Sequence, residues 1–194
     1  MAHGNPYGKI IKYSTKDNTA IDQTTLGLFP ASMQVSKITG FIYCVNFNLH
    51  GDMKPSTVSV IDAETMTEIT KIKTGSMPHG SRISKDGLKQ YSVAMMSGEL
   101  FEIDALSLKV SRKLDLDNHS LMDHGKMAVG ENKMKHSSVK PTWVIPHPNK
   151  SLAYVAGNAS NEIIEINLNN SLSLFNNQNF FRSDELTVLD TVIM

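Results

Sequence analysis

A proline, a tyrosine and an aspartate recur at fixed distances along this chain, and that repeat limits the fold more than any other feature. In the middle of the chain, 13 residues separate Pro78 from Tyr91 and another 13 separate Tyr91 from Asp104. From Asp62 to Pro78 the distance is 16 residues, so the basic period is 42 residues. The anchors on either side are Pro30, Tyr43 and Asp62 upstream, and Pro141, Tyr154 and Asn167 downstream. Such a period is typical of solenoids and propellers.

One repeat unit contains four short segments with the alternation of β-strands. We expect these strands at Ser81–Ser84, Gln90–Ala94, Glu99–Ile103 and Leu108–Leu114, with a tight turn at Lys85-Asp86-Gly87 between the first two. Glycine suits such a turn because it adopts positive φ without strain. Four antiparallel strands of this length form one blade of a propeller. The sequence therefore predicts an all-β fold, a β-propeller of four-stranded antiparallel blades.

The repeat extends over residues 1–168 and predicts about three and a half blades. The blades are expected near residues 30–73, 78–116 and 141–168, preceded by two outer strands, with an inserted loop at 117–139 and an irregular tail at 169–194. Within this tail, Leu186–Ile193 could still form an outer strand. A partial propeller leaves a sheet face uncovered at each end. We therefore expect a second propeller half as partner, from a homo-oligomer or another subunit, unless the chain is a fragment of a longer protein.

Several strand sequences resemble a known repeat. Tyr91-Ser-Val-Ala, Tyr43-Cys-Val-Asn, Tyr154-Val-Ala-Gly-Asn and Pro78-His-Gly are similar to the YVTN-type β-propeller repeat. That family is similar to surface-layer, quinoprotein-like, haem-d1-type and nitrous-oxide-reductase-type propellers. The resemblance implies the fold and an extracytoplasmic setting, periplasmic or extracellular. It implies no single activity, because the fold serves many functions.

Composition excludes several classes of protein. The 194 residues carry 19 basic and 19 acidic side chains, so nothing favours nucleic acid as a partner. The single cysteine, Cys44, excludes an intrachain disulfide framework. The sequence contains no run of 18 apolar residues, so it predicts no membrane-spanning helix. The first nine residues lack the apolar core of a signal peptide, so export would need a signal outside this sequence.

Two insertions interrupt the period, at Phe47–Thr57 and at Asp117–Val139. In a propeller the loops between second and third strands share one face with the connections between blades, and both insertions fall on that face. Six of the seven histidines map to this face as well, and only His147 maps to the opposite one. Long loops on a rigid scaffold are where functional residues gather. His79 begins an inner strand beside the central channel, so it is our candidate cofactor-binding residue, although Pro-His-Gly could also serve only to shape the loop.

The second insertion is rich in methionine and histidine. Thioether and imidazole groups together suit Cu(I), and imidazole also suits Cu(II). The fragment Met122-Asp-His-Gly-Lys-Met127 is similar to the Met/His repeats of bacterial copper-resistance proteins. Copper is therefore the metal we expect, unless these residues have no common role in a surface loop. The candidate metal ligands are His119, Met122, His124, Met127, Met134 and His136, with His50 on the same face.

Two classes of function stay open at the level of sequence. The first is an extracytoplasmic binding or interaction module, with copper held by the Met/His-rich loop. The second is part of a redox enzyme that holds a copper cluster or haem on the same face. A multi-histidine cluster at the channel would need histidines from most blades, and the connection before Pro30 has none. The sequence favours the interaction module and assigns no catalytic residue.

Overall fold

The computed structural model describes residues 7–49, 54–117, 136–169 and 187–193. Every regular element in these ranges is a β-strand. The strands are β1 (Tyr7–Tyr13), β2 (Ala20–Leu28), β3 (Pro30–Val35), β4 (Phe41–Asn46), β5 (Pro55–Asp62), β6 (Glu68–Ser76), β7 (Pro78–Ile83), β8 (Lys89–Ala94), β9 (Glu99–Asp104), β10 (Lys109–Asp115), β11 (Pro141–Pro146), β12 (Leu152–Gly157), β13 (Glu162–Asn167) and β14 (Thr187–Ile193).

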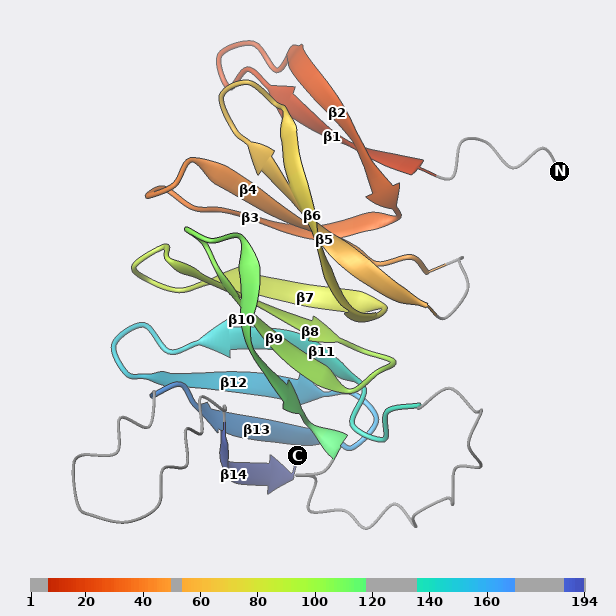
Figure 1. The fold of residues 1–194 in the computed structure, drawn as a ribbon, viewed down its shortest axis with the longest axis vertical. Coiled ribbons are helices and arrows are strands. Elements are labelled where there is room, and N and C mark those ends of the chain that lie inside the picture. Colours follow the sequence, from red (N-terminus) through yellow and green to blue (C-terminus); the bar gives the residue numbers. More distant parts are fainter. Residues whose placement is uncertain (1–6, 50–53, 118–135, 170–186, 194) are drawn as a thin grey trace, which may run out of the picture.

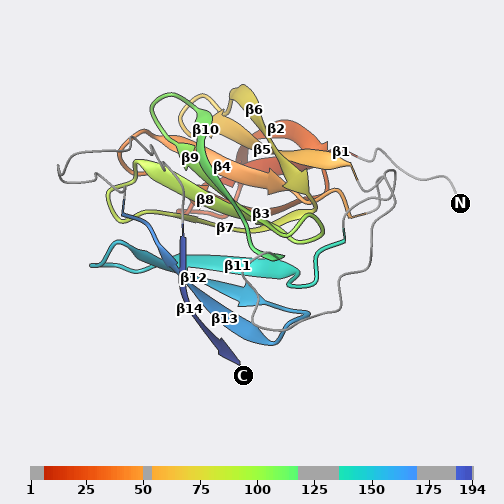
Figure 2. The same ribbon diagram turned by 60° about the horizontal axis from the view of Figure 1, so that its bottom comes forward.

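The strands form a two-stranded sheet, β1-β2, and three four-stranded antiparallel sheets, β3-β4-β5-β6, β7-β8-β9-β10 and β11-β12-β13-β14. Each sheet is a meander in which every strand pairs with the next strand of the chain. The sheets lie face against face in chain order (Figures 1 and 2). The expectation of an all-β fold with four-stranded antiparallel sheets is confirmed.

The first strands of the three large sheets lie next to one another, β3 beside β7 and β7 beside β11. Their backbones approach closely where the repeat places small residues. The Ser81 N–H donates to Ser32 Oγ at 3.3 Å between β7 and β3. A Cβ added at Gly80 would lie 2.3 Å from the Thr142 carbonyl oxygen of β11. Glycine at this position therefore allows β7 and β11 to pack in contact.

The middle strands of the second and third sheets are buried on both faces, because each of these sheets packs between two neighbours. In β4, Ile42 and Cys44 pack with Ile10 and Leu26 of the two-stranded sheet. Tyr43 and Val45 alternate with them and pack towards the third sheet around Ile103. A further apolar cluster joins the last two sheets through residues that include Val93, Leu100, Val144, Val155 and Ile164. The core is thus three apolar layers between four sheets.

The recurring aspartate closes the turn after the third strand. Asp62 Oδ1 accepts the Glu64 and Thr65 N–H groups at 3.0 and 2.7 Å. Asp104 Oδ1 accepts the N–H groups of Leu106 and Ser107 in the same way. An aspartate that bonds backbone two and three residues ahead stabilises a tight turn. This explains why the spacing from tyrosine to aspartate marks the repeat.

The end of the chain contains the outer strand that the sequence left open at Leu186–Ile193. Thr187–Ile193 forms β14 and pairs antiparallel with β13, from Asn167↔Thr187 to Glu162↔Ile193. The last sheet therefore has four strands rather than three. Hydrogen bonding to the exposed edge of β13 places this strand, and the 42-residue period does not announce it.

Candidate functional site

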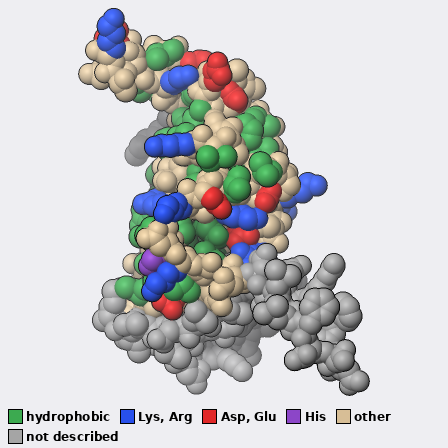
Figure 3. Space-filling view, turned by 90° about the vertical axis from the view of Figure 1, so that its left-hand side faces the viewer, with side chains coloured by type: hydrophobic (Ala, Val, Ile, Leu, Met, Phe, Trp, Pro, Cys, Tyr) green, Lys and Arg blue, Asp and Glu red, His purple; other side chains and the backbone are tan. Residues whose placement is uncertain are grey.

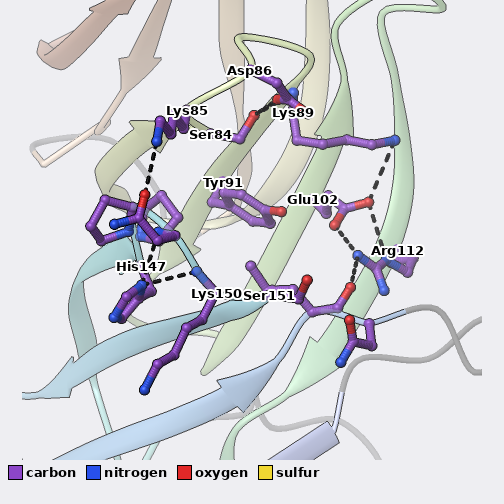
Figure 4. A pocket seen from close by; sticks show the side chains of 15 residues that line it. Ser84, Lys85, Asp86, Lys89, Tyr91, Glu102, Arg112, His147, Lys150 and Ser151 are labelled. Atoms are coloured by element: carbon purple, nitrogen blue, oxygen red, sulfur yellow. Dashed lines mark hydrogen bonds and ion pairs between the residues drawn. The ribbon is translucent and has the colours of Figure 1, made fainter.

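A groove opens between the third and fourth sheets, at the end where the β7–β8 and β11–β12 turns lie (Figure 4). Its volume is about 980 Å³. Side chains from both turns form its rim, and side chains of the middle of the third sheet lie deeper. The lining residues are Ser84, Lys85, Asp86, Lys89, Tyr91, Glu102, Arg112, Pro146, His147, Pro148, Asn149, Lys150, Ser151, Leu168 and Asn169.

A buried ion pair lies at the inner end of this groove. Arg112 of β10 stands opposite Glu102 of β9 in the strand register, so their side chains meet on one face of the sheet. The Arg112 guanidinium donates twice to Glu102, and its Nη2 also donates to the Leu168 carbonyl at 3.2 Å. The side chains are only 8% and 2% exposed, respectively. Arg112 Nη1 is buried and has no acceptor among the described residues.

Electrostatics keep Glu102 ionised inside the sheet interface. Burial acts to raise the pKa of Glu102, but hydrogen bonds from Arg112 and Ser111 outweigh it and hold this pKa below its ordinary range. Beside it, Tyr91 is buried, and burial together with the Glu102 charge raises the pKa of the Tyr91 phenol. The inner end of the groove therefore holds one carboxylate, one guanidinium and one neutral phenol.

The rim of the groove is cationic. Lys85 donates to the Asn149 side chain at 2.8 Å and bridges the two turns. Lys89 binds Asp104 at 2.8 Å and lies 3.7 Å from Glu102. The Lys150 ammonium has no partner among the described residues. Basic side chains and a histidine lie close together on this side of the molecule (Figure 3).

His147 belongs to the same rim and has a defined orientation. Its Nδ1 accepts the backbone N–H groups of Asn149 and Lys150, both at 3.0 Å. Because Nδ1 acts as acceptor, the neutral ring carries its hydrogen on Nε2. The rim therefore offers hydrogen-bond donors and positive charge, which together recognise oxygen acceptors and anions.

The equivalent interface between the second and third sheets is packed at its turns and lacks the ion pair. There the β3–β4 turn packs directly on the β7–β8 turn, with Ser36 Oγ donating to the Gly87 carbonyl at 2.9 Å. Gly87 has a φ of 72°, and a Cβ added there would lie 2.9 Å from Ile38. In the strand register Val60 and Thr70 occupy the positions of Glu102 and Arg112. The groove is therefore a departure from the repeat.

His79, our candidate cofactor-binding residue, lies between inner strands. Its ring makes edge contacts with Phe47 and Trp143, at centroid distances of 4.9 and 5.5 Å. Its Nδ1 lies 3.1 Å from the Thr142 carbonyl oxygen, so Nδ1 is the donor and Nε2 is the nitrogen that could bind a metal. Arg82 stacks over Trp143 at 5.0 Å and completes this contact between β7 and β11.

Most of the predicted metal ligands lie outside the described residues. These are His50, His119, Met122, His124, Met127 and Met134. His136 is described and exposed. No group of three or more His, Cys, Asp or Glu side chains with the geometry of a metal site occurs within the described ranges.

The two ends of the second insertion are held together. Asp117 Oδ1 accepts the N–H groups of Ser138 and Val139 at 2.9 and 3.1 Å, and the Ser137 hydroxyl at 2.8 Å. The Ser137 N–H donates to the Met96 carbonyl of the β8–β9 loop. The base of the insertion is therefore fixed to the third sheet by this cluster.

Our sequence analysis did not find the groove. It assigned His147 to the face opposite the other histidines and gave it no role. The sequence does contain a signal for the groove. Between the two ends of the strand Glu99–Asp104, Glu102 is the only charged residue, and its counterpart in the preceding repeat is Val60. A charge at a position that is apolar in the neighbouring repeat indicates a local function or an ion pair.

Comparison with solved structures identifies the fold. The chain superposes on the β-propeller domain of Cps50 (Swd1) from Myceliophteria thermophila with a TM-score of 0.54 and 13% identity, covering 85% of this chain and 38% of that one. The chain has a β-propeller fold. The structure of U3-55K also superposes on this propeller chain, with a TM-score of 0.65 and 11% identity. The match covers 96% of this chain and 48% of U3-55K. A protein from Lactobacillus plantarum matches with a TM-score of 0.66 and 14% identity, covering 98% and 51%.

The propeller chain thus spans about half the length, or less, of these structures. No family model matches the sequence, and no curated protein does. Across the described part of the propeller we find no helix with the length and apolar character needed to span a bilayer.

Proposed function

We propose that this chain is a protein-interaction module, a partial β-propeller completed by blades from a second copy of itself. One observation carries the proposal: the two-stranded sheet at the beginning of the described chain has an uncovered apolar face. Exposed fractions there are 54% for Tyr7, 41% for Ile11, 55% for Tyr13 and 59% for Ile21. The opposite face, with Ile10 and Leu26, is buried against the second sheet.

The register explains how these side chains gather. Tyr7, Ile11 and Tyr13 alternate with Ile10 along β1, and the exposed Ile21 is the extra residue of β2 between the pairs Lys12↔Asp22 and Tyr13↔Ala20, beside Tyr13. Lys9 and Gln23 also lie on the exposed face, where they are hydrogen-bonded at 3.3 Å. A sheet that carries large apolar side chains on both faces is suited to a position between two other sheets. The fold supports this proposal, because propellers close with about four to eight blades and the similar structures are about twice as long as this chain.

The mass of the protein in solution tests the proposal. We expect sedimentation equilibrium to give at least twice the 21.4 kDa of the single chain. The double variant Ile11→Glu/Ile21→Lys places charges on the exposed face and should weaken association at least about tenfold, since two buried apolar contacts are lost. Leu106→Glu is the matched control, because Leu106 is 73% exposed in the β9–β10 turn. A cooperatively melting monomer at micromolar concentration would refute self-association.

Copper binding by the Met/His-rich insertion is a second proposal, and it keeps the extracytoplasmic setting that the family resemblance implies. It is supported by the residue pattern and by the Asp117 cluster, which holds the base of the insertion in place. The ligands would come from His119, Met122, His124, Met127, Met134 and His136, with His50 or His79 from the same face.

Copper analysis of the purified protein tests this site. We expect the deletion of residues 118–136 to abolish copper binding measured by emission spectrometry, while His147→Ala leaves the stoichiometry unchanged. Affinity should fall as the pH drops below about 6.5, because protonated imidazole cannot ligate a metal. Unchanged copper content after the deletion would show that the insertion is not the site.

A further inference from the structure

The groove between the β7–β8 and β11–β12 turns carries charge that its repeat counterpart lacks. Its lining has four basic side chains, Lys85, Lys89, Arg112 and Lys150, against two carboxylates, Asp86 and Glu102. The whole chain has a net charge of zero. Arg112 is paired with Glu102 and Lys89 with Asp104, so the positive charge that attracts negatively charged groups to the groove is mainly that of Lys85 and Lys150.

The two carboxylates of the groove are already occupied by donors from the protein. Glu102 accepts from Arg112 and from the Ser111 hydroxyl. Asp86 accepts from the Ser84 hydroxyl and the Leu88 N–H. Lys89 is paired with Asp104 and lies near Glu102, so the two lysines of the rim that remain without an ion pair among the described residues are Lys85 and Lys150. Lys150 has no partner within the described residues, and the only partner of Lys85 there is the neutral Asn149 amide.

The inner end of the groove holds a donor without an acceptor. Arg112 Nη1 is buried and has no acceptor in the described part of the chain, whereas Nε and Nη2 are used by Glu102 and Leu168. A buried donor without a partner destabilises the folded state. A ligand oxygen that reached this atom would remove that destabilisation.

We propose that this groove binds an acidic peptide segment of a partner protein, with aspartate or glutamate carboxylates against Lys85 and Lys150. This inference rests on the proposed function as an interaction module and names the partner chemistry of a second surface on it. The positive side chains come from two different turns, from β8 and from β10, and they surround the groove rather than converge on one point (Figure 4). Such a distribution suits several carboxylates spaced along a chain.

The rest of the lining suits a peptide better than a free anion. Pro146, Pro148 and Leu168 contribute apolar surface beside the charges. The planar fork of Arg112, which would bind a phosphate through two parallel hydrogen bonds, is already used by Glu102. Lysines act as point charges without that geometry, and a peptide carboxylate needs no more.

Fluorescence anisotropy with a defined probe tests the groove. The probe is a fluorescein-labelled ten-residue peptide of alternating glutamate and alanine, titrated with the full chain at low and at physiological salt. We expect saturable binding that weakens as salt rises. Lys85→Glu/Lys150→Glu should weaken binding at least about tenfold, because two attractive contacts become repulsive.

A matched pair of substitutions separates this site from general charge. Lys16 and Lys37 lie in the β1–β2 and β3–β4 turns, and neither lines the groove. Lys16→Glu/Lys37→Glu changes the net charge by the same amount, and we expect it to alter affinity by less than about twofold. Circular dichroism melting of both variants checks that the sheets remain folded, and Lys85→Gln/Lys150→Gln gives an intermediate loss if folding of the first pair fails.

Four results would contradict the acidic-peptide site. Equal losses in the two Lys→Glu pairs, absence of binding, or tighter binding of a single-stranded oligonucleotide or of the same peptide with phosphoserine would each overturn the acidic-peptide site. Sedimentation of the same samples reports the proposed assembly separately. If Lys85→Glu/Lys150→Glu loses peptide binding while its mass in solution is unchanged, the peptide site in the groove is supported. If the wild type is a monomer that still binds the peptide, self-association is refuted and the peptide site is retained.

Discussion

At the scale of single residues, the Glu102–Arg112 pair is the largest departure from the repeat. In the preceding sheet the two equivalent positions are occupied by Val60 and Thr70. Replacing a buried ion pair by apolar groups is often neutral, whereas removing one partner leaves a buried charge uncompensated. The pair therefore makes the third sheet sensitive to single substitutions and tolerant of a double one.

This contrast gives a prediction for chemical denaturation. Arg112→Thr should lower the free energy of unfolding by about 3 kcal/mol, because Glu102 then stays buried without its donor. Glu102→Val/Arg112→Thr, which copies the preceding sheet, should recover most of that loss. Urea titrations followed by circular dichroism measure both values. A double variant as unstable as the single one would mean that the interface needs the charges themselves.

Acid stability depends on the carboxylates whose pKa values are lowered. The hydrogen bond from Lys89 is the main cause that lowers the pKa of Asp104, and N–H and hydroxyl groups of Ser107 add to it. Asp104 has an ordinary pKa of 3.8 and Glu102 one of 4.5. A lowered folded pKa stabilises the native state above the ordinary value, and this stability is lost as the pH falls below it.

We therefore expect the melting temperature to be nearly constant from pH 7 to about 5 and to fall below about pH 4.5. Asp104→Asn keeps an oxygen for the turn but loses the charge that faces Lys89. Its melting temperature should fall less steeply between about pH 4.5 and 2 than that of the wild type. Scanning calorimetry across this range measures the slopes, and identical slopes would exclude Asp104 as a contributor.

At the scale of elements, the Asp117 cluster joins the two ends of the long insertion where they meet the sheets. Both ends of the insertion are fixed there before the chain re-enters β11. The cost of closing a loop grows only slowly with its length, so the sheets tolerate a long insertion at this point. The stability of the base should thus depend on Asp117 rather than on the length of the insertion.

A pair of variants tests this dependence. Asp117→Ala should lower the free energy of unfolding by about 2 kcal/mol, because two N–H groups and two hydroxyls lose their acceptor. Joining Asp117 to Ser137 through a short glycine–serine linker should change it by less than about 1 kcal/mol. Urea denaturation compares the two, and a larger loss from the shortened loop than from the alanine would contradict this dependence.

The repeat predicted the sheets because each strand carries local signals. The alternation in Phe41–Asn46 and Lys89–Ala94 and the Asp62 and Asp104 turns depend only on nearby residues. β14 falls outside the period, because an Asn-rich stretch precedes it, so the sequence offered a strand at Leu186–Ile193 only as an alternative and could not show that it pairs with β13. The groove was missed for a similar reason, since it joins residues of two sheets that are far apart in sequence.

At the scale of the whole molecule, the stack of sheets has a covered middle and a less covered end. The third sheet packs against neighbours on both faces, and Val93, Leu100 and Ile103 in it are fully buried. The two-stranded sheet packs on one face only, with Ile11 and Ile21 exposed on the other. In a repeat architecture stability is the sum of each unit and its interfaces with its neighbours.

Amide hydrogen exchange should therefore show a gradient along the chain. We expect the slowest exchange in β8 and β9, where both faces are covered, and much faster exchange in β1 and β2 of the dissociated variant Ile11→Glu/Ile21→Lys. In the assembled wild type, β1 and β2 should gain protection of at least about tenfold, because a second sheet covers their exposed face. Mass spectrometry of peptic fragments at two protein concentrations measures both effects. Equal exchange of β1 and β2 in the variant and the wild type, at every concentration, would mean that no partner sheet covers this face.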